Sequence, residues 1–134
     1  MDQGPLVIEE IDAGERLVRA FDEYEPVKAA FWLKASDEEQ RYLYLASDGI
    51  DDTNFDVAYG EVLRLANQMR SPYLDPFRVK LISGQDPLAQ SAVDINRRFR
   101  GPIATRFGGK SFGGLSVDDV YIYPSPLPAA ATST

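Results

Sequence analysis

The chain of 134 residues contains no cysteine and no histidine. Without cysteine it forms no disulfides and offers no thiolate as a metal ligand or nucleophile. Without histidine it lacks the commonest general base and the commonest transition-metal ligand. It has no apolar run close to the roughly 20 residues of a membrane-spanning helix, and its N-terminus lacks a signal-peptide pattern. These absences argue against the usual hydrolase and metalloenzyme chemistries, and we expect a soluble protein of the cytoplasm.

Acidic and basic side chains are unevenly distributed along the chain, whose net charge is −7. Residues 1–60 hold 15 acidic and 5 basic side chains, whereas residues 61–110 hold 4 acidic and 9 basic ones. A protein that coats duplex DNA is basic overall, so the acidic balance argues against that class. It is compatible with a local basic surface, and with attraction between the two halves or toward a partner.

Three segments have the apolar spacing of amphipathic helices; they are residues 12–24, 53–70 and 87–98. The first is expected to begin in a capping box at Asp12–Glu15, with residues 1–10 as an irregular lead-in. The second carries the strongest helical pattern in the sequence. The third follows Asp86 and starts with a proline, because aspartate is a preferred N-cap and proline a preferred first helical residue.

Five segments alternate apolar and polar residues as half-buried strands do; they are residues 27–35, 41–47, 77–82, 103–107 and 115–123. The first two are close enough to form a β-hairpin around the polar turn 36–40. The glycines of segment 108–114 are expected to let the chain turn between the last two strands. In the last strand the apolar phase slips at Asp118-Asp119, which indicates a β-bulge.

The order of these elements, αββαβαββ, predicts the α+β class. We expect a mixed, mostly antiparallel sheet of five strands, in which the third strand is connected through the second helix. The helices are expected to pack on one face of this sheet. Residues 1–124 are predicted to form a single domain, and the Pro/Ala/Ser/Thr-rich residues 125–134 a disordered tail.

Two motifs invite a ligand-binding interpretation but depart from the patterns they resemble. Gly109-Lys110-Ser111 ends like a P-loop, yet Ala104 stands where the motif needs its first glycine, and a strand is expected to follow where the motif needs a helix. Asp52–Asp56 begins like an EF-hand loop, yet Val57 replaces the glycine at its sixth position and Leu63 the glutamate at its twelfth. We therefore predict neither a cofactor nor a metal ion.

Carboxylates remain as the main proton carriers for catalysis. Adjacent pairs such as Glu38-Glu39 and Asp118-Asp119 fall at caps, turns or the bulge, where solvent reaches them. No nucleophile stands beside a base at a telling spacing. An enzyme that relies on carboxylates is therefore a third hypothesis behind two binding functions, and we assign no catalytic residue.

The second face of the predicted sheet gathers aromatic and basic side chains. If Leu43 and Leu45 face the helices together with Phe31, the alternate positions of each strand share the opposite face. This aromatic-basic face holds five aromatic and five basic residues: Lys28, Trp32, Lys34, Arg41, Tyr42, Tyr44, Arg78, Lys80, Tyr121 and Tyr123. Three interpretations of it remain open.

The first interpretation is a surface for a protein partner or for self-association, for instance as a homodimer, because Trp, Tyr and Arg dominate binding hot spots. The second is a platform on which the bases of single-stranded nucleic acid stack, although the domain lacks the basic excess usual for that class. In the third, the side chains merely cover an exposed sheet. We expect a non-catalytic interaction module, with nucleic-acid binding as its alternative and no membrane partner.

A second group of cations follows the predicted third helix: Arg97, Arg98, Arg100 and Arg106. They either extend the aromatic-basic face or bind an acidic partner. Arginines at the C-terminal end of a helix are also favoured by the helix dipole alone, which needs no ligand.

The runs TRFGGKSFGGLSVDDVYIYP and DEYEPVKAAFWL resemble a group of small bacterial proteins of unassigned function. In that group an Arg-Phe-Gly strand, a glycine turn and an acidic-aromatic last strand recur. The resemblance spans most of residues 12–124. The group carries no established activity, so the resemblance implies no functional residues.

Overall fold

The computed structural model describes residues 5–101, 103–125 and 127, which form three α-helices and six strands. In chain order the elements are α1 (Ile8–Tyr24), β1 (Ala29–Ala35), β2 (Tyr42–Ser47), α2 (Phe55–Met69), the 3-10 turn η1 (Pro76–Arg78), β3 (Val79–Ser83), α3 (Pro87–Arg98), β4 (Thr105–Phe107), β5 (Lys110–Phe112) and β6 (Leu115–Ile122). This confirms the predicted α+β class. Of the tail predicted over 125–134, only Ser125 and Leu127 lie within the described residues. No helix in this part of the chain is long and apolar enough to cross a bilayer.

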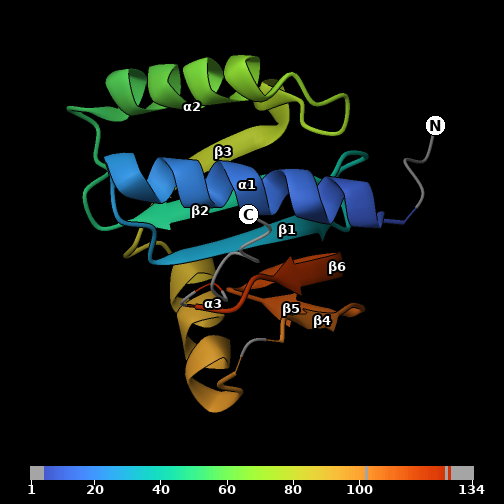
Figure 1. Ribbon diagram of the computed structural model, residues 1–134. Coiled ribbons are helices and arrows are strands. Elements are labelled where there is room, and N and C mark those ends of the chain that lie inside the picture. The colour runs from blue at the N-terminus through green and yellow to red at the C-terminus, as the bar shows by residue number, and fades with distance from the viewer. Residues whose placement is uncertain (1–4, 102, 126, 128–134) are drawn as a thin grey trace.

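The strands form one mixed sheet in the order β3-β2-β1-β6-β4, and β5 also pairs with β6 (Figure 1). β1 and β2 form the predicted antiparallel hairpin, and β6 is antiparallel to β1, β4 and β5. β3 lies parallel to β2, because α2 carries the chain back along the sheet between them. The mixed, mostly antiparallel sheet is therefore confirmed, with one strand more than the five expected.

The predicted bulge in the last strand is confirmed at Asp118. The register between β1 and β6 shifts by one residue between Lys34 and Ala35, which leaves Asp118 as the extra residue of β6. A bulge reverses the side to which later residues project. Val117 and Val120 therefore both lie in the same buried cluster, although they are three positions apart, a spacing that puts residues of a regular strand on opposite faces.

The sixth strand arises because the glycine-rich segment pairs with β6 on both sides of an interruption at Gly108-Gly109. β4 and β5 are two halves of one edge strand, opposite the bulge. A Cβ on Gly108 would lie 2.2 Å from the carbonyl oxygen of Asp118, so only glycine fits there. Gly113 and Gly114 form the tight turn into β6 with φ of 59° and 82°, a region that glycine adopts without steric cost.

Helices cover both faces of the sheet, so the prediction that they pack on one face is wrong. α1 and α2 lie on one face and α3 lies on the other (Figure 1). On the two-helix face, Phe21 of α1 and Val62 of α2 pack with Trp32 of β1. On the one-helix face, Ala92 of α3 packs with Phe31 of β1.

The central strand β1 explains why two faces are covered. Six of its seven residues are buried, so both of its sides are apolar. Burying one Phe or Leu side chain contributes about 1.5–3 kcal/mol. A sheet whose centre is apolar on both sides is stable in water only when each side is covered, as in other sheets sandwiched between helices.

α1 begins at Ile8, within the segment expected to be irregular, so the capping box predicted at Asp12–Glu15 is wrong. At the observed start, the backbone N–H of Val7 donates a hydrogen bond to the Glu10 side chain at 3.1 Å. This contact satisfies one of the backbone groups that a helix end leaves unpaired. The sequence gives no Ser, Thr or Asp at position 7, and the usual signal of a helix start is therefore missing.

α2 and α3 begin close to their predicted starts. Ahead of α2, the Asp51 carboxylate accepts a hydrogen bond from the N–H of Thr53 at 2.8 Å. At α3, the Asp86 carboxylate accepts one from the N–H of Leu88 at 2.9 Å, and Pro87 is the first helical residue. The predicted N-cap of α3 is confirmed.

Candidate interaction surface

The residues of the aromatic-basic face do not share one surface. Residues opposite each other on neighbouring strands project to the same face. Trp32 lies opposite Leu43, and Tyr44 lies opposite Phe31. The prediction that Leu43 shares a face with Phe31 is therefore wrong, because the hairpin register places it beside Trp32. Of the aromatic members, Trp32, Tyr121 and Tyr123 lie on the two-helix face, and Tyr42 and Tyr44 lie on the one-helix face.

Trp32 and Tyr123 are interior residues, with exposed fractions of 4% and 2%. The Trp32 indole donates a hydrogen bond to the Tyr123 hydroxyl at 2.9 Å, and that hydroxyl donates one to the Ile11 carbonyl at 2.6 Å. Burial raises the pKa of the Tyr123 phenol far above its usual range. Gly14 allows α1 this close, since a Cβ there would lie 2.4 Å from the Tyr123 hydroxyl. The pair fastens α1 to the sheet and presents no ring to a partner.

Tyr42, Tyr44 and Lys80 form a separate cluster on the one-helix face. The Lys80 ammonium lies 4.1 Å from the centre of the Tyr42 ring and 5.5 Å from that of Tyr44. Tyr44 stacks on Phe31 with ring centres 5.1 Å apart. Burial raises the pKa of Tyr44, and Lys80 opposes that shift. These three side chains therefore contact one another and Phe31 within the one-helix face, and no binding partner is needed to explain their positions.

The five basic residues of the aromatic-basic face each pair with an acidic residue. The pairs are Lys28 with Asp48 (3.3 Å), Lys34 with Asp118 (2.8 Å), Arg41 with Asp119 (3.3 Å), Arg78 with Asp75 (3.9 Å) and Lys80 with Glu38 (3.8 Å). Each positive charge is therefore offset by a neighbouring carboxylate. The set does not form a basic surface.

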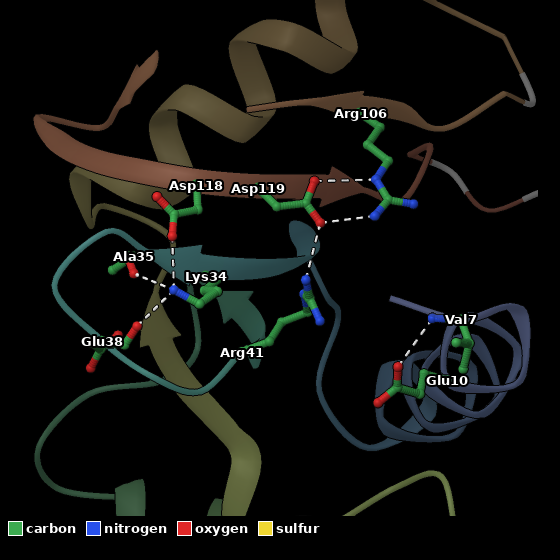
Figure 2. Close-up of polar contacts among 9 residues, drawn as sticks. All are labelled: Val7, Glu10, Lys34, Ala35, Glu38, Arg41, Arg106, Asp118 and Asp119. Atoms are coloured by element: carbon green, nitrogen blue, oxygen red, sulfur yellow. Dashed lines mark hydrogen bonds and ion pairs between the residues drawn. The ribbon is translucent and has the colours of Figure 1, made fainter. Parts of the chain in front are cut away.

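The two carboxylates at the bulge bind separate groups of cations (Figure 2). Asp119 accepts hydrogen bonds from Arg41 at 3.3 Å and from two nitrogens of Arg106 at 3.1 and 2.9 Å. Asp118 accepts one from Lys34 at 2.8 Å, which holds the pKa of that carboxyl below its usual range. Because each carboxylate has its own cation, the pair does not share a proton as a catalytic acid dyad does.

A cleft of about 270 Å³ brings together three residues of the aromatic-basic face: Trp32, Arg41 and Arg78. Glu10 and Asp75 also line this cleft. Two carboxylates thus accompany two guanidinium groups, and the cleft has no net charge with which to select an anion.

A different hollow lies between α3 and the edge strand, and we call it the edge groove. Its volume is about 410 Å³, and its lining includes Asp94, Ile95 and Phe99 from the α3 side and Thr105, Phe107 and Phe112 from the strands. Phe99 is 63% exposed and ends α3, where its N–H donates to the Ile95 carbonyl at 2.9 Å. A second hollow of about 410 Å³ adjoins Phe99 and is lined also by Arg100, Ile103 and Arg106. The large apolar ring of Phe99 is thus exposed to solvent between two hollows.

Cations lie on and near the edge groove. Lys110 lines it, Arg100 and Arg106 line the adjoining hollow, and Arg97 and Arg98 are the last two residues of α3. Arg98 pairs with Asp94 at 3.0 Å, and Arg106 pairs with Asp119. Within the described residues no ion pair reaches Arg97, Arg100 or Lys110, all of which are exposed. This end of the molecule therefore carries positive charge that its own acids do not offset.

Sequence reasoning found the arginines of this surface but missed its apolar part. Phe99 fits the spacing of the buried stripe of α3, and the structure buries only Ala89 and Ala92 of that helix. The available signal was its position between Arg98 and Arg100, at the very end of the helix.

The two ligand motifs occupy structures that do not suit their chemistry. Gly109-Lys110-Ser111 leads into β5, whereas a P-loop wraps around phosphate ahead of a helix. Asp51, beside the EF-hand-like run, accepts hydrogen bonds within the turn ahead of α2, and those from Thr53 hold the pKa of its carboxyl below the usual range. Within the described ranges, no group of three acidic side chains is arranged to hold a metal ion.

No family model, no curated protein and no solved structure matches the chain. The resemblance to small bacterial proteins therefore stays a prediction.

Proposed function

We propose that this chain is a non-catalytic protein-interaction module whose edge groove binds an acidic polypeptide segment that also carries apolar side chains. The observation that carries the proposal is Phe99, exposed beside a hollow, with Arg97, Arg100 and Lys110 at the same end of the molecule and without ion pairs to the described residues. Aromatic rings and arginines are the residue types that dominate binding hot spots. The cytoplasmic location expected from the sequence stays a prediction.

Charge and apolar surface have different roles in this proposal. The ring of Phe99 and the groove beside it supply apolar area to bury on binding. Arg97, Arg100 and Lys110 supply electrostatic attraction, which raises the association rate and selects an acidic partner over a basic one. The partner is therefore expected to alternate or interleave apolar and acidic side chains.

The alternative of single-stranded nucleic acid has less support. Stacking of bases requires accessible rings, and Trp32, Tyr44 and Tyr123 of the predicted platform are all buried. The cations at the edge groove attract phosphate as well as carboxylate. A nucleic acid therefore belongs in the experiment as a competing ligand.

The test uses a fluorescein-labelled ten-residue peptide in which Glu and Val alternate, followed by fluorescence anisotropy. We expect saturable binding to the wild type that weakens with salt, because exposed charges are screened. A peptide in which Lys replaces Glu, and a labelled oligothymidine, are expected to bind at least about tenfold more weakly, a difference of about 1.4 kcal/mol. Absence of binding by the acidic peptide at low ionic strength would falsify the proposal, and stronger binding of the oligothymidine would favour the nucleic-acid alternative.

Matched variants locate the site. Phe99→Ala is expected to weaken binding at least about tenfold, whereas Phe77→Ala removes an equally exposed ring on η1 (75% exposed) and leaves binding unchanged. Arg100→Glu is compared with Arg16→Glu on α1, which changes the net charge by the same amount far from the groove. Equal effects of the two charge reversals would show that overall charge, and no local site, attracts the peptide.

A further inference from the structure

The edge strand that borders the edge groove has an unpaired outer side. β4 and β5 pair with β6 in one continuous register, from Thr105 opposite Ile122 to Phe112 opposite Leu115. In the part of the chain that the structure describes, no strand pairs with the other side of β4 or β5. A row of backbone N–H and C=O groups at a sheet edge is a template for a further strand.

We infer, resting on the proposed function, that the acidic segment binds as an extended strand added to β4–β5. An added strand lies about 4.7–4.9 Å from its neighbour, and its side chains project alternately to the two faces. Thr105, Phe107 and Phe112 of the edge strand already line the groove. Alternate side chains of the added strand therefore reach the groove beside Phe99, while its backbone pairs with the edge.

The charges on the edge select the chemistry of the added strand. Lys110 lies on β5, and Arg97 and Arg100 lie at the end of α3, all without an ion pair to the described residues, whereas Arg106 of β4 is already paired with Asp119. Opposite charges facing each other across neighbouring strands are stabilising, and like charges are destabilising. An acidic strand is therefore favoured at this edge.

The same charges argue against a second copy of this chain as the occupant. In a symmetric dimer joined edge to edge, the same surface of each copy meets itself. Arg106 and Lys110 of one copy would then approach Arg106 and Lys110 of the other, with Arg97 and Arg100 of both copies nearby. We therefore assign the edge to a different, acidic polypeptide.

Cations and bulges on an edge strand also protect proteins from indiscriminate pairing, so the test must detect backbone pairing itself. In an added strand only every second backbone N–H points at the domain. Two versions of the Glu-Val peptide are made, one N-methylated at two odd positions and one at two even positions. Both lose two donors, but only one version loses donors that face β4–β5. We expect that version to bind at least tenfold more weakly than the unmodified peptide, and the other within threefold of it.

Amide hydrogen exchange of the domain supplies an independent measurement. On saturation with the peptide, amides in residues 105–112 are expected to exchange more slowly, with β3 at the opposite edge of the sheet as an internal control. If both methylated peptides bind alike and the exchange of residues 105–112 does not change, strand addition is wrong while binding in the edge groove stands. If the unmodified peptide does not bind, the proposed function itself fails, and strand addition fails with it.

Discussion

The two faces of the sheet differ in how completely helices close them. On the two-helix face, the indole of Trp32 and the phenol of Tyr123 are buried and hydrogen-bonded beneath α1. On the one-helix face, α3 has only 12 residues, and the side chains that it buries fully are small, Ala89 and Ala92. Phe99, which follows the last residue of α3, is exposed. In this protein, an aromatic residue therefore indicates an interaction surface only where no helix covers it.

The ion pairs also differ between the residues of the predicted aromatic-basic face and the edge groove. The five basic residues first assigned to an interaction face each contact a carboxylate of the same chain. At the edge groove, three exposed cations have no such contact within the described residues. A surface prepared for an acidic partner is expected to keep cations free in this way, because pairing them internally would reduce the attraction.

The largest difference between the two faces is expected when one large ring is removed from each of them. Trp32→Ala is expected to lower the free energy of unfolding by about 3–5 kcal/mol, the usual cost of deleting a buried aromatic side chain. Phe99→Ala is expected to change it by less than about 0.5 kcal/mol, as exposed substitutions do. Urea unfolding followed by circular dichroism measures both. Similar losses in the two variants would mean that Phe99 is a core residue and would remove the basis for the edge groove.

A smaller effect is expected from deleting a single hydroxyl on the closed face. Tyr123→Phe leaves the Trp32 indole without its acceptor and the Ile11 carbonyl without its donor, at a cost of about 1–3 kcal/mol for an unsatisfied buried group. Tyr24→Phe is the matched control, since Tyr24 is 43% exposed. Its unfolding free energy is expected to stay within about 0.5 kcal/mol of the wild type. If the two variants are equally stable, the hydrogen bonds of Tyr123 do not fasten α1 to the sheet.

Most of the fold follows from the sequence because its strongest signals are local. The Asp86-Pro87 start of α3 and the slip at the bulge each lie within a few consecutive residues, and the helical spacing of α2 lies within one segment of 15 residues. The two faces of the sheet were assigned wrongly for a physical reason. β1 is apolar on both sides, so its alternation does not show which residues of β2 share a face with it; the hairpin register decides that, and it pairs Phe31 with Tyr44.

The candidate site was predicted only in part. Arg97, Arg98, Arg100 and Arg106 were identified because charge is visible in a sequence. The exposure of Phe99 was not, because it depends on where α3 lies over the sheet and on how far the helix extends beyond it. The short strand β5 was also missed, since its three residues are flanked by glycines and are recognisable only by their pairing with β6.

The smallest expected effect concerns Asp118 at the bulge of β6, the strand that separates the sheet centre from the open edge. Lys34 holds the pKa of this carboxyl below its usual range, so the Asp118 contact favours the folded state above the carboxyl's pKa in the unfolded chain, about 3.9. That contribution is lost as the pH falls through the lower folded-state value. Lys34→Met is therefore expected to raise the pKa of Asp118, measured by NMR titration of its side-chain carboxyl carbon. The stability difference between the variant and the wild type is expected to shrink below about pH 4.

Lys28→Met is the control for this titration, because Lys28 pairs with Asp48 and does not contact the bulge. It is expected to leave the pKa of Asp118 unchanged. An Asp118 pKa that stays low in Lys34→Met would assign the shift to the other groups around the bulge, such as Ser36, whose hydroxyl donates to the same carboxylate at 3.0 Å. The double variant Lys34→Met/Ser36→Ala then separates the two donors. Because Asp118 is solvent-exposed, this ion pair orients the bulge more than it stabilises the fold, and binding at the edge groove is expected to change little in either variant.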